Sequence, residues 1–193
     1  MALRGHEPAA LGFRAHSGWA VLIAVAGDTP LLRRRIEMFQ GSGFRANQPY
    51  HAAAEMQLAQ AEAFLKQTEE TAVGMAAAQI QAAMDELAAA GHRVTQAAVL
   101  LGSSRPLPEL SKILAAHPLI HTAEGIFYRS VLRSACERCG LAVTGIRERD
   151  VPPDLSAQVA TLGKILGPPW TQDEKLSAAA AIHAVAPRRE EKK

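Results

Sequence analysis

Aromatic residues and cysteines are scarce in this chain. Of its 193 residues, 5% are aromatic and two are cysteines, whereas 48% are hydrophobic. The core must therefore be built mainly from Ala, Leu, Val and Ile, and the disulfide framework of small secreted domains is excluded. Because only 21% of the residues are charged, the composition is that of a globular chain rather than a disordered one.

An excess of one charge sign and a long apolar run are also missing. The 21 Lys and Arg residues face 19 Asp and Glu, so the net charge of +2 gives no strong field for nucleic acid or an anionic membrane. The most apolar stretch, Trp19 to Ala26, is far shorter than the ~20 residues of a membrane-spanning helix. We expect a cytoplasmic protein whose residues 1–187 form a single α/β domain, followed by a disordered charged tail at 188–193.

Several common catalytic motifs are absent. The sequence contains no G-x-x-x-x-G-K-[ST], G-x-G-x-x-G, G-x-S-x-G or H-E-x-x-H. Standard P-loop NTPases, dinucleotide-binding domains, serine hydrolases with a nucleophile elbow and zincin proteases are therefore set aside.

The first 40 residues predict an antiparallel meander of three strands. Apolar and β-branched residues cluster at 10–16, 19–26 and 31–39, and turn-forming residues separate these runs. Alternation along the third run places Leu32 on the core face and Arg34 at the edge of that face. We expect the basic run 33–35 to form a solvated face.

The rest of the chain alternates between helical and strand patterns. An apolar stripe from Ala61 to Leu87, with Gly91 behind it, predicts one long helix. The remaining predicted elements are a strand at 94–101, a helix at 108–116, a short strand at 119–121, a helix with Thr122 as its N-cap that ends at Gly140, a strand at 141–146, and helices that begin at Asp154 and Thr171. This pattern predicts an α/β fold with a mixed sheet of five or six strands and helices packed on it.

The element order β-β-β-α-β-α-β-α resembles the ribonuclease H-like superfold, to which Holliday-junction resolvases, actin-like ATPases and the middle domain of peptide release factors belong. The first predicted strand ends in His16-Ser17-Gly18, where nucleases and ATPases of that superfold carry Asp-x-Gly. No Asp or Glu closes the predicted strand that ends at Leu101. Two-metal phosphodiester cleavage needs several carboxylates. The resemblance therefore implies a non-nuclease module, closest in kind to the release-factor middle domain, that binds RNA, a ribonucleoprotein or a protein partner.

A ligand site is expected at one edge of the sheet. Ligands of open α/β sheets bind beyond the carboxyl ends of parallel strands, where helix N-termini also favour anions. The residues expected in this cleft are Ser103, Ser104, Arg105, His51 and Thr122 as ligand-binding groups, with His16, His121 and Glu124 as catalytic groups. They suit a second hypothesis, a small-molecule hydrolase or phosphate-ligand enzyme, in which an imidazole is the acid or base and Glu124 its partner. Thr122 and Glu124 would also serve as ordinary N-terminal residues of a helix.

The chain contains the residue types of an imidazole–carboxylate metal site, but not at the sequence spacing of a known metal-binding motif. His16, His51 and His121 with Glu124 stand in no recognised metal-binding spacing, so we expect no metal and no other cofactor.

The Cys136-x-x-Cys139 pair would lie at the end of a helix rather than at its start, which disfavours redox chemistry and predicts buried, reduced thiols. His117 and His121 have the H-x-x-x-H spacing that could complete a zinc site with this pair. A helix of about 16 residues, or about 24 Å, would keep the two halves apart. The sequence does not determine the oligomeric state, and a homodimer is one of the alternatives.

Overall fold

A computed structural model describes residues 7–41, 47–102 and 106–185. It contains one five-stranded mixed sheet in the order β3-β2-β1-β4-β5, which confirms the predicted architecture. The strands are β1 (Glu7–His16), β2 (Trp19–Ala26), β3 (Thr29–Glu37), β4 (His92–Leu101) and β5 (Ala142–Arg147). The first three form the antiparallel meander, and β4 and β5 run parallel to β1. Ser103, Ser104, Arg105 and the predicted tail at 188–193 lie outside the described residues.

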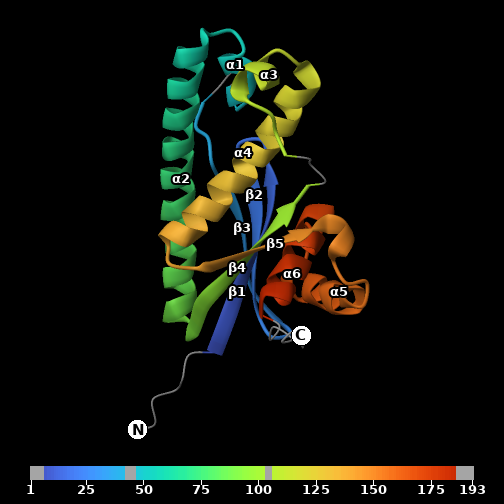
Figure 1. The fold of residues 1–193 in the computed structure, drawn as a ribbon. Coiled ribbons are helices and arrows are strands. Elements are labelled where there is room, and N and C mark those ends of the chain that lie inside the picture. The colour runs from blue at the N-terminus through green and yellow to red at the C-terminus, as the bar shows by residue number, and fades with distance from the viewer. Residues whose placement is uncertain (1–6, 42–46, 103–105, 186–193) are drawn as a thin grey trace, which may run out of the picture.

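Helices cover both faces of this sheet (Figure 1). They are α1 (Pro49–Ala53), α2 (Leu58–Ala89), α3 (Leu110–Leu114), α4 (His117–Arg138), α5 (Leu155–Leu166) and α6 (Gln172–Val185), with a 3₁₀ turn at Glu148–Asp150. Side chains alternate along β1, so Leu11 and Phe13 pack with α2 and α4, whereas Ala10 packs with α6. The sheet thus separates an α2/α4 side from an α5/α6 side.

The α5/α6 side depends on a very close approach between β1 and α6. A Cβ atom at Gly12 would lie 2.5 Å from the backbone nitrogen of Ala181 and still closer to the carbonyl oxygen of Ser177. The Ser177 hydroxyl donates a hydrogen bond of 3.2 Å to the carbonyl oxygen of Val21. Glycine at position 12 therefore lets α6 rest on the backbone of the sheet.

The predicted helix ends are confirmed where local chemistry sets them. Gly91 follows α2 with a φ of +89°, a left-handed conformation that glycine adopts without strain. At the start of α6, Glu174 Oε2 accepts a 2.8 Å hydrogen bond from the Thr171 backbone N–H, and Thr171 Oγ1 accepts one of 3.2 Å from the Asp173 N–H. These bonds are those of a capping box, except that the backbone N–H that donates to the hydroxyl belongs to the second helical residue rather than the third.

The predicted strand at 119–121 is wrong, because these residues lie inside α4. The N-cap of α4 is Ala116, and Pro118 occupies its first turn, where a missing N–H costs nothing. Ile120 then joins the buried side of the helix. Thr122 is consequently not an N-cap, and its hydroxyl donates a 3.0 Å bond to the Pro118 carbonyl within the helix. The connection from β4 to β5 is therefore one crossover through α3 and α4, not two strand–helix units.

The basic run at 33–35, predicted as a solvated face, is half-buried at Arg33 and Arg34 and exposed at Arg35, and each arginine also has an intramolecular partner. Arg33 donates hydrogen bonds to the carbonyl oxygens of the turn before α6, at residues 167–169. Arg34 pairs with Glu86 of α2 across 2.5 Å. Arg35 lies 3.8 Å from the centre of the Trp19 ring. Each guanidinium has its own intramolecular partner, since alternation along β3 sends neighbours to opposite faces.

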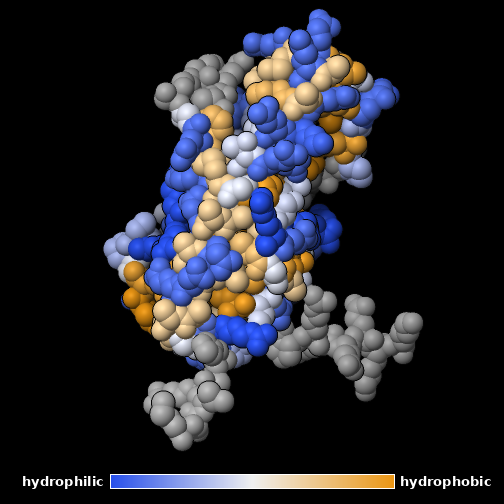
Figure 2. All heavy atoms as spheres, turned by 90° about the vertical axis from the view of Figure 1, so that its left-hand side faces the viewer, coloured by the Kyte–Doolittle hydropathy of each residue, from blue (hydrophilic) through white to orange (hydrophobic). Residues whose placement is uncertain are grey.

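Seen from the α2 side, the surface mixes hydrophilic residues with paler apolar ones (Figure 2). The apolar stripe of α2 is turned inward, with Leu65, Ile80 and Leu87 buried. Among the helices described, none is both long and apolar enough to cross a membrane.

Candidate functional site

The carboxyl end of β1 is where α1, α4 and α6 come together. Figure 1 shows the first turns of α4 reaching beyond the strand ends to meet α1. His16, His121 and Glu124 line one pocket there, with a volume of about 250 Å³. The three residues expected to be catalytic are therefore brought together, although by a helix and not by the predicted second strand. Thr122 is not among the lining residues.

Glu124 is the central buried acid of this region. Its side chain is 5% exposed, and Oε1 accepts hydrogen bonds from the backbone N–H groups of Tyr50 (2.9 Å) and His51 (3.2 Å). These amides belong to the first turn of α1, so Glu124 of α4 caps a neighbouring helix. Burial raises the pKa of Glu124 to about 7, against the opposing effect of these bonds and of His121. Its Oε2 is buried and has no hydrogen-bond partner within the described ranges.

His16 is held by a carboxylate and by a ring. Its Nε2 lies 3.1 Å from Asp173 Oδ2, an ion-pair distance without the alignment of a good hydrogen bond. The imidazole stacks on Trp19, with 4.2 Å between ring centres and 12° between planes. Asp173 also pairs with Arg14, whose guanidinium lies 3.7 Å from Glu148. An imidazole fixed in this way against an acid is suited to proton transfer.

Three histidines form a cluster beside the pocket. One nitrogen atom from each of His51, His117 and His121 lies within 4.8 Å of the other two. His117 Nε2 and His121 Nε2 are 3.0 Å apart, one helical turn from each other on α4. His51 is buried in α1, and its Nδ1 lies 3.2 Å from Glu124 Oε1.

His117 was not predicted to be part of this site. Because residues 119–121 were predicted to form a strand, His117 and His121 were expected on different elements. The spacing of four residues was the available signal, because it brings two side chains to the same face once both lie on one helix. The cysteines lie far from these histidines, as the helix length predicted: Cys136 is buried and free near the opposite end of α4, and burial raises the pKa of its thiol.

A basic groove of about 540 Å³ follows the carboxyl ends of β4 and β5. Arg129, Arg133 and Arg147 are the charged residues among its described lining, and two of them have acidic partners outside it: Arg133 lies 3.8 Å from Glu137, and Arg147 lies 2.5 Å from Asp150. The Arg129 guanidinium lies against two glycines: a Cβ at Gly102 or at Gly125 would be 3.1 or 3.2 Å from it. Desolvation lowers the pKa of Arg129. The Arg129 guanidinium makes no ion pair with the residues that the structure describes.

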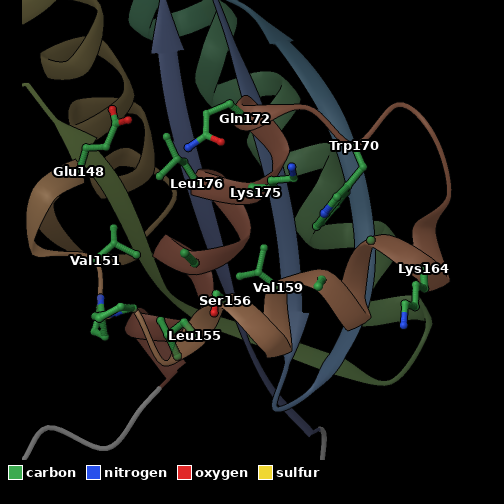
Figure 3. A pocket seen from close by; sticks show the side chains of 15 residues that line it. Glu148, Val151, Leu155, Ser156, Val159, Lys164, Trp170, Gln172, Lys175 and Leu176 are labelled. Carbon is green, nitrogen blue, oxygen red and sulfur yellow. The ribbon is translucent and has the colours of Figure 1, made fainter.

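A pocket larger than these two lies elsewhere, between α5 and α6, and none of the expected site residues is among its described lining (Figure 3). Its volume is about 740 Å³, and Val159, Leu176 and Trp170 contribute to a mainly apolar wall. The Trp170 indole packs so tightly on Gly163 that a Cβ there would overlap the ring. Its polar lining residues are Glu148, Ser156, Lys164, Gln172 and Lys175, and no histidine is among the described lining residues.

Comparison with known proteins identifies the architecture. No family model matches the chain, and no curated protein sequence matches it. Two solved structures of Thermus thermophilus RuvC do match. One, in complex with a Holliday junction substrate, has a TM-score of 0.53 and 12% identity and covers 90% of each chain. The other has a TM-score of 0.51 and 13% identity, covering 90% of this chain and 91% of RuvC. The chain has the ribonuclease H-like fold.

The residues at the ends of β1 and β4 are not carboxylates. His16 stands at the end of β1, and Leu101 at the end of β4. Among the described residues, the one group of three or more metal-ligating side chains is the histidine cluster, which contains no carboxylate. Identities of 12–13% show the fold alone. The chemistry has to be argued from the site itself.

Proposed function

We propose that this protein is a hydrolytic enzyme for a small anionic substrate, which binds in the pocket at the end of β1. The observation that carries the proposal is that His16, His121 and Glu124 share one pocket. A volume of about 250 Å³ suits a small substrate or one end of a larger one.

His16 is the acid–base group in this proposal. It accepts a proton from an attacking water, and the nearby Asp173 carboxylate stabilises the imidazolium that forms. The hydroxide adds to the acyl or phosphoryl centre, the ester bond breaks, and the leaving oxygen takes the proton back. Glu124 Oε2 accepts a hydrogen bond from a hydroxyl group of the substrate, since Oε1 is occupied by α1.

A cation close to the pocket favours an anionic substrate. Arg129 lies against Gly125, which lines the pocket, although the Arg129 side chain itself lines the groove at the ends of β4 and β5. A half-buried guanidinium is weakly screened and presents several donors in one plane, which matches a carboxylate or a phosphate.

The test is hydrolysis of a panel of p-nitrophenyl esters and p-nitrophenyl phosphates, followed by product release. For the substrate turned over fastest, we expect His16→Gln to lower kcat/KM by about 100-fold or more and Asp173→Asn by about 10-fold. His183→Gln, at an exposed position of α6, is the matched control and should change nothing. Absence of turnover across the panel, or equal turnover by His16→Gln, would contradict the proposal.

A second candidate function is nucleic-acid binding, which the basic groove favours. Three arginines line it without an acidic neighbour in the lining, and one structural relative is in complex with a Holliday junction substrate. Phosphate contacts make affinity fall steeply with salt. If the groove binds a four-way DNA junction or an RNA hairpin, Arg129→Gln and Arg133→Gln should each reduce the slope of log affinity against log salt by about 1. Unchanged slopes in both variants would exclude this groove.

A further inference from the structure

We propose that His51, His117 and His121 together bind one divalent transition-metal ion of the zinc class. Their three ring nitrogens lie within 4.8 Å of one another, on two helices that meet at the end of β1. Imidazole is a preferred ligand of zinc, and three histidines with an open fourth position form a known kind of zinc centre. The absence of a carboxylate from the group argues against magnesium or calcium.

The distances suit such an ion. Zn–N bonds of about 2.0–2.1 Å place two ligand nitrogens of a tetrahedral site about 3.3 Å apart. His117 Nε2 and His121 Nε2 are already 3.0 Å apart. Both residues are exposed, so small side-chain rotations are enough to direct the two lone pairs and that of His51 at one point.

Glu124 provides the supporting interaction that ligand histidines usually have. In metal sites the ring nitrogen that does not bind the ion commonly donates to a carboxylate, which fixes the tautomer. His51 Nδ1 lies 3.2 Å from Glu124 Oε1, and this carboxylate is itself held by two backbone amides. A proton on Nδ1 keeps the lone pair on Nε2, the nitrogen that would bind the ion.

The fourth coordination position would be open. His117 and His121 are exposed, so water can reach an ion held between them. His121 also lines the pocket of His16 and Glu124, which places a metal-bound water at the edge of that pocket. Its use as the nucleophile rests on the proposed function, whereas binding of the ion does not.

The experiment uses the full chain, expressed without an affinity tag and stripped with a chelator. Zinc is titrated in competition with a chromogenic chelator, and cobalt is added separately to follow the visible absorption of a four-coordinate site. We expect one equivalent per chain, with affinity at least 100-fold weaker in His117→Gln and in His121→Gln. Glu124→Gln should weaken binding by about 10-fold, as a change in a supporting residue does. His16→Gln and His183→Gln should bind as the unchanged protein does.

Two results would overturn the site: no stoichiometric binding of zinc or cobalt, or binding that survives both His117→Gln and His121→Gln. Circular dichroism checks that His117→Gln and His121→Gln fold. Both positions are exposed, so we expect the two variants to fold normally. Failure of the metal site and failure of the enzyme are distinguishable. If the protein binds one zinc ion but neither the zinc-loaded nor the stripped form hydrolyses any substrate, the metal site is retained and the proposed enzymatic function is rejected. If the protein binds no zinc and a chelator leaves its hydrolytic activity unchanged, the proposed function is retained and the metal site is rejected.

Discussion

The two faces of the sheet are packed in opposite ways. On the α5/α6 side, small residues bring α6 onto the backbone of β1, with Gly12 against Ser177 and Ala181. On the α2/α4 side, large side chains such as Phe13 and Tyr128 fill the space between sheet and helices. On the close side α6 covers the middle of β1 directly, and the Ser177 hydroxyl there is bonded to the Val21 carbonyl oxygen. The site therefore forms at the strand end, where α4 extends past the sheet and meets α1.

Gly12→Ala should have the largest effect, because it adds a Cβ where the close side has only backbone atoms. Neither the strand nor α6 can move without losing other contacts, so we expect a loss of about 3 kcal/mol in the free energy of unfolding. Urea denaturation measures it. A loss below about 1 kcal/mol would mean that the two faces are equally adaptable.

Glu124→Ala should cost about 2 kcal/mol, since two backbone amides and the His51 ring lose a buried acceptor. The loss should be concentrated at α1, seen as faster hydrogen exchange of the amides of Tyr50 and His51. Glu124→Gln keeps an acceptor oxygen and should retain most of the protection. Uniformly faster exchange over the whole chain would show that Glu124 supports the core rather than α1.

Gly163→Ala tests the close side at its outer layer, between α5 and the turn before α6. Alanine favours the helix, but its Cβ would overlap the Trp170 ring, which has to move. We expect a net loss of about 1 kcal/mol and a shift in tryptophan fluorescence. Unchanged fluorescence would show that α5 moves instead of the ring.

Gly74→Ala should have the smallest effect and the opposite sign. A Cβ at this position of α2 meets nothing within 4 Å, so only helix propensity changes. We expect a gain of about 0.5–1 kcal/mol in the free energy of unfolding. This variant is the matched control for Gly12→Ala, and a loss of stability here would contradict the open space around position 74.

Local patterns were enough to predict most of the fold. Turn residues and alternation define the meander, and the apolar stripe defines α2, because both signals come from neighbours in the chain. The apolar residues at 119–121 were too few to distinguish a strand from part of a helix. In the structure these residues belong to α4, where Ile120 is buried. His16, His121 and Glu124 were predicted to converge, and they do.

The histidine cluster could not be predicted in the same way. His51 and Glu124 are 73 residues apart, and a five-residue helix brings them together. No local period marks such a contact. Its existence depends on where α1 docks, which is a property of the whole fold.

The carboxylate of Glu124 connects two events that would otherwise be separate. A helix of five residues has little stability alone, so α1 keeps its shape only while docked on α4. Docking also places His51 beside His117 and His121. Ion capture and α1 docking are thus thermodynamically linked, and each must strengthen the other by the same factor.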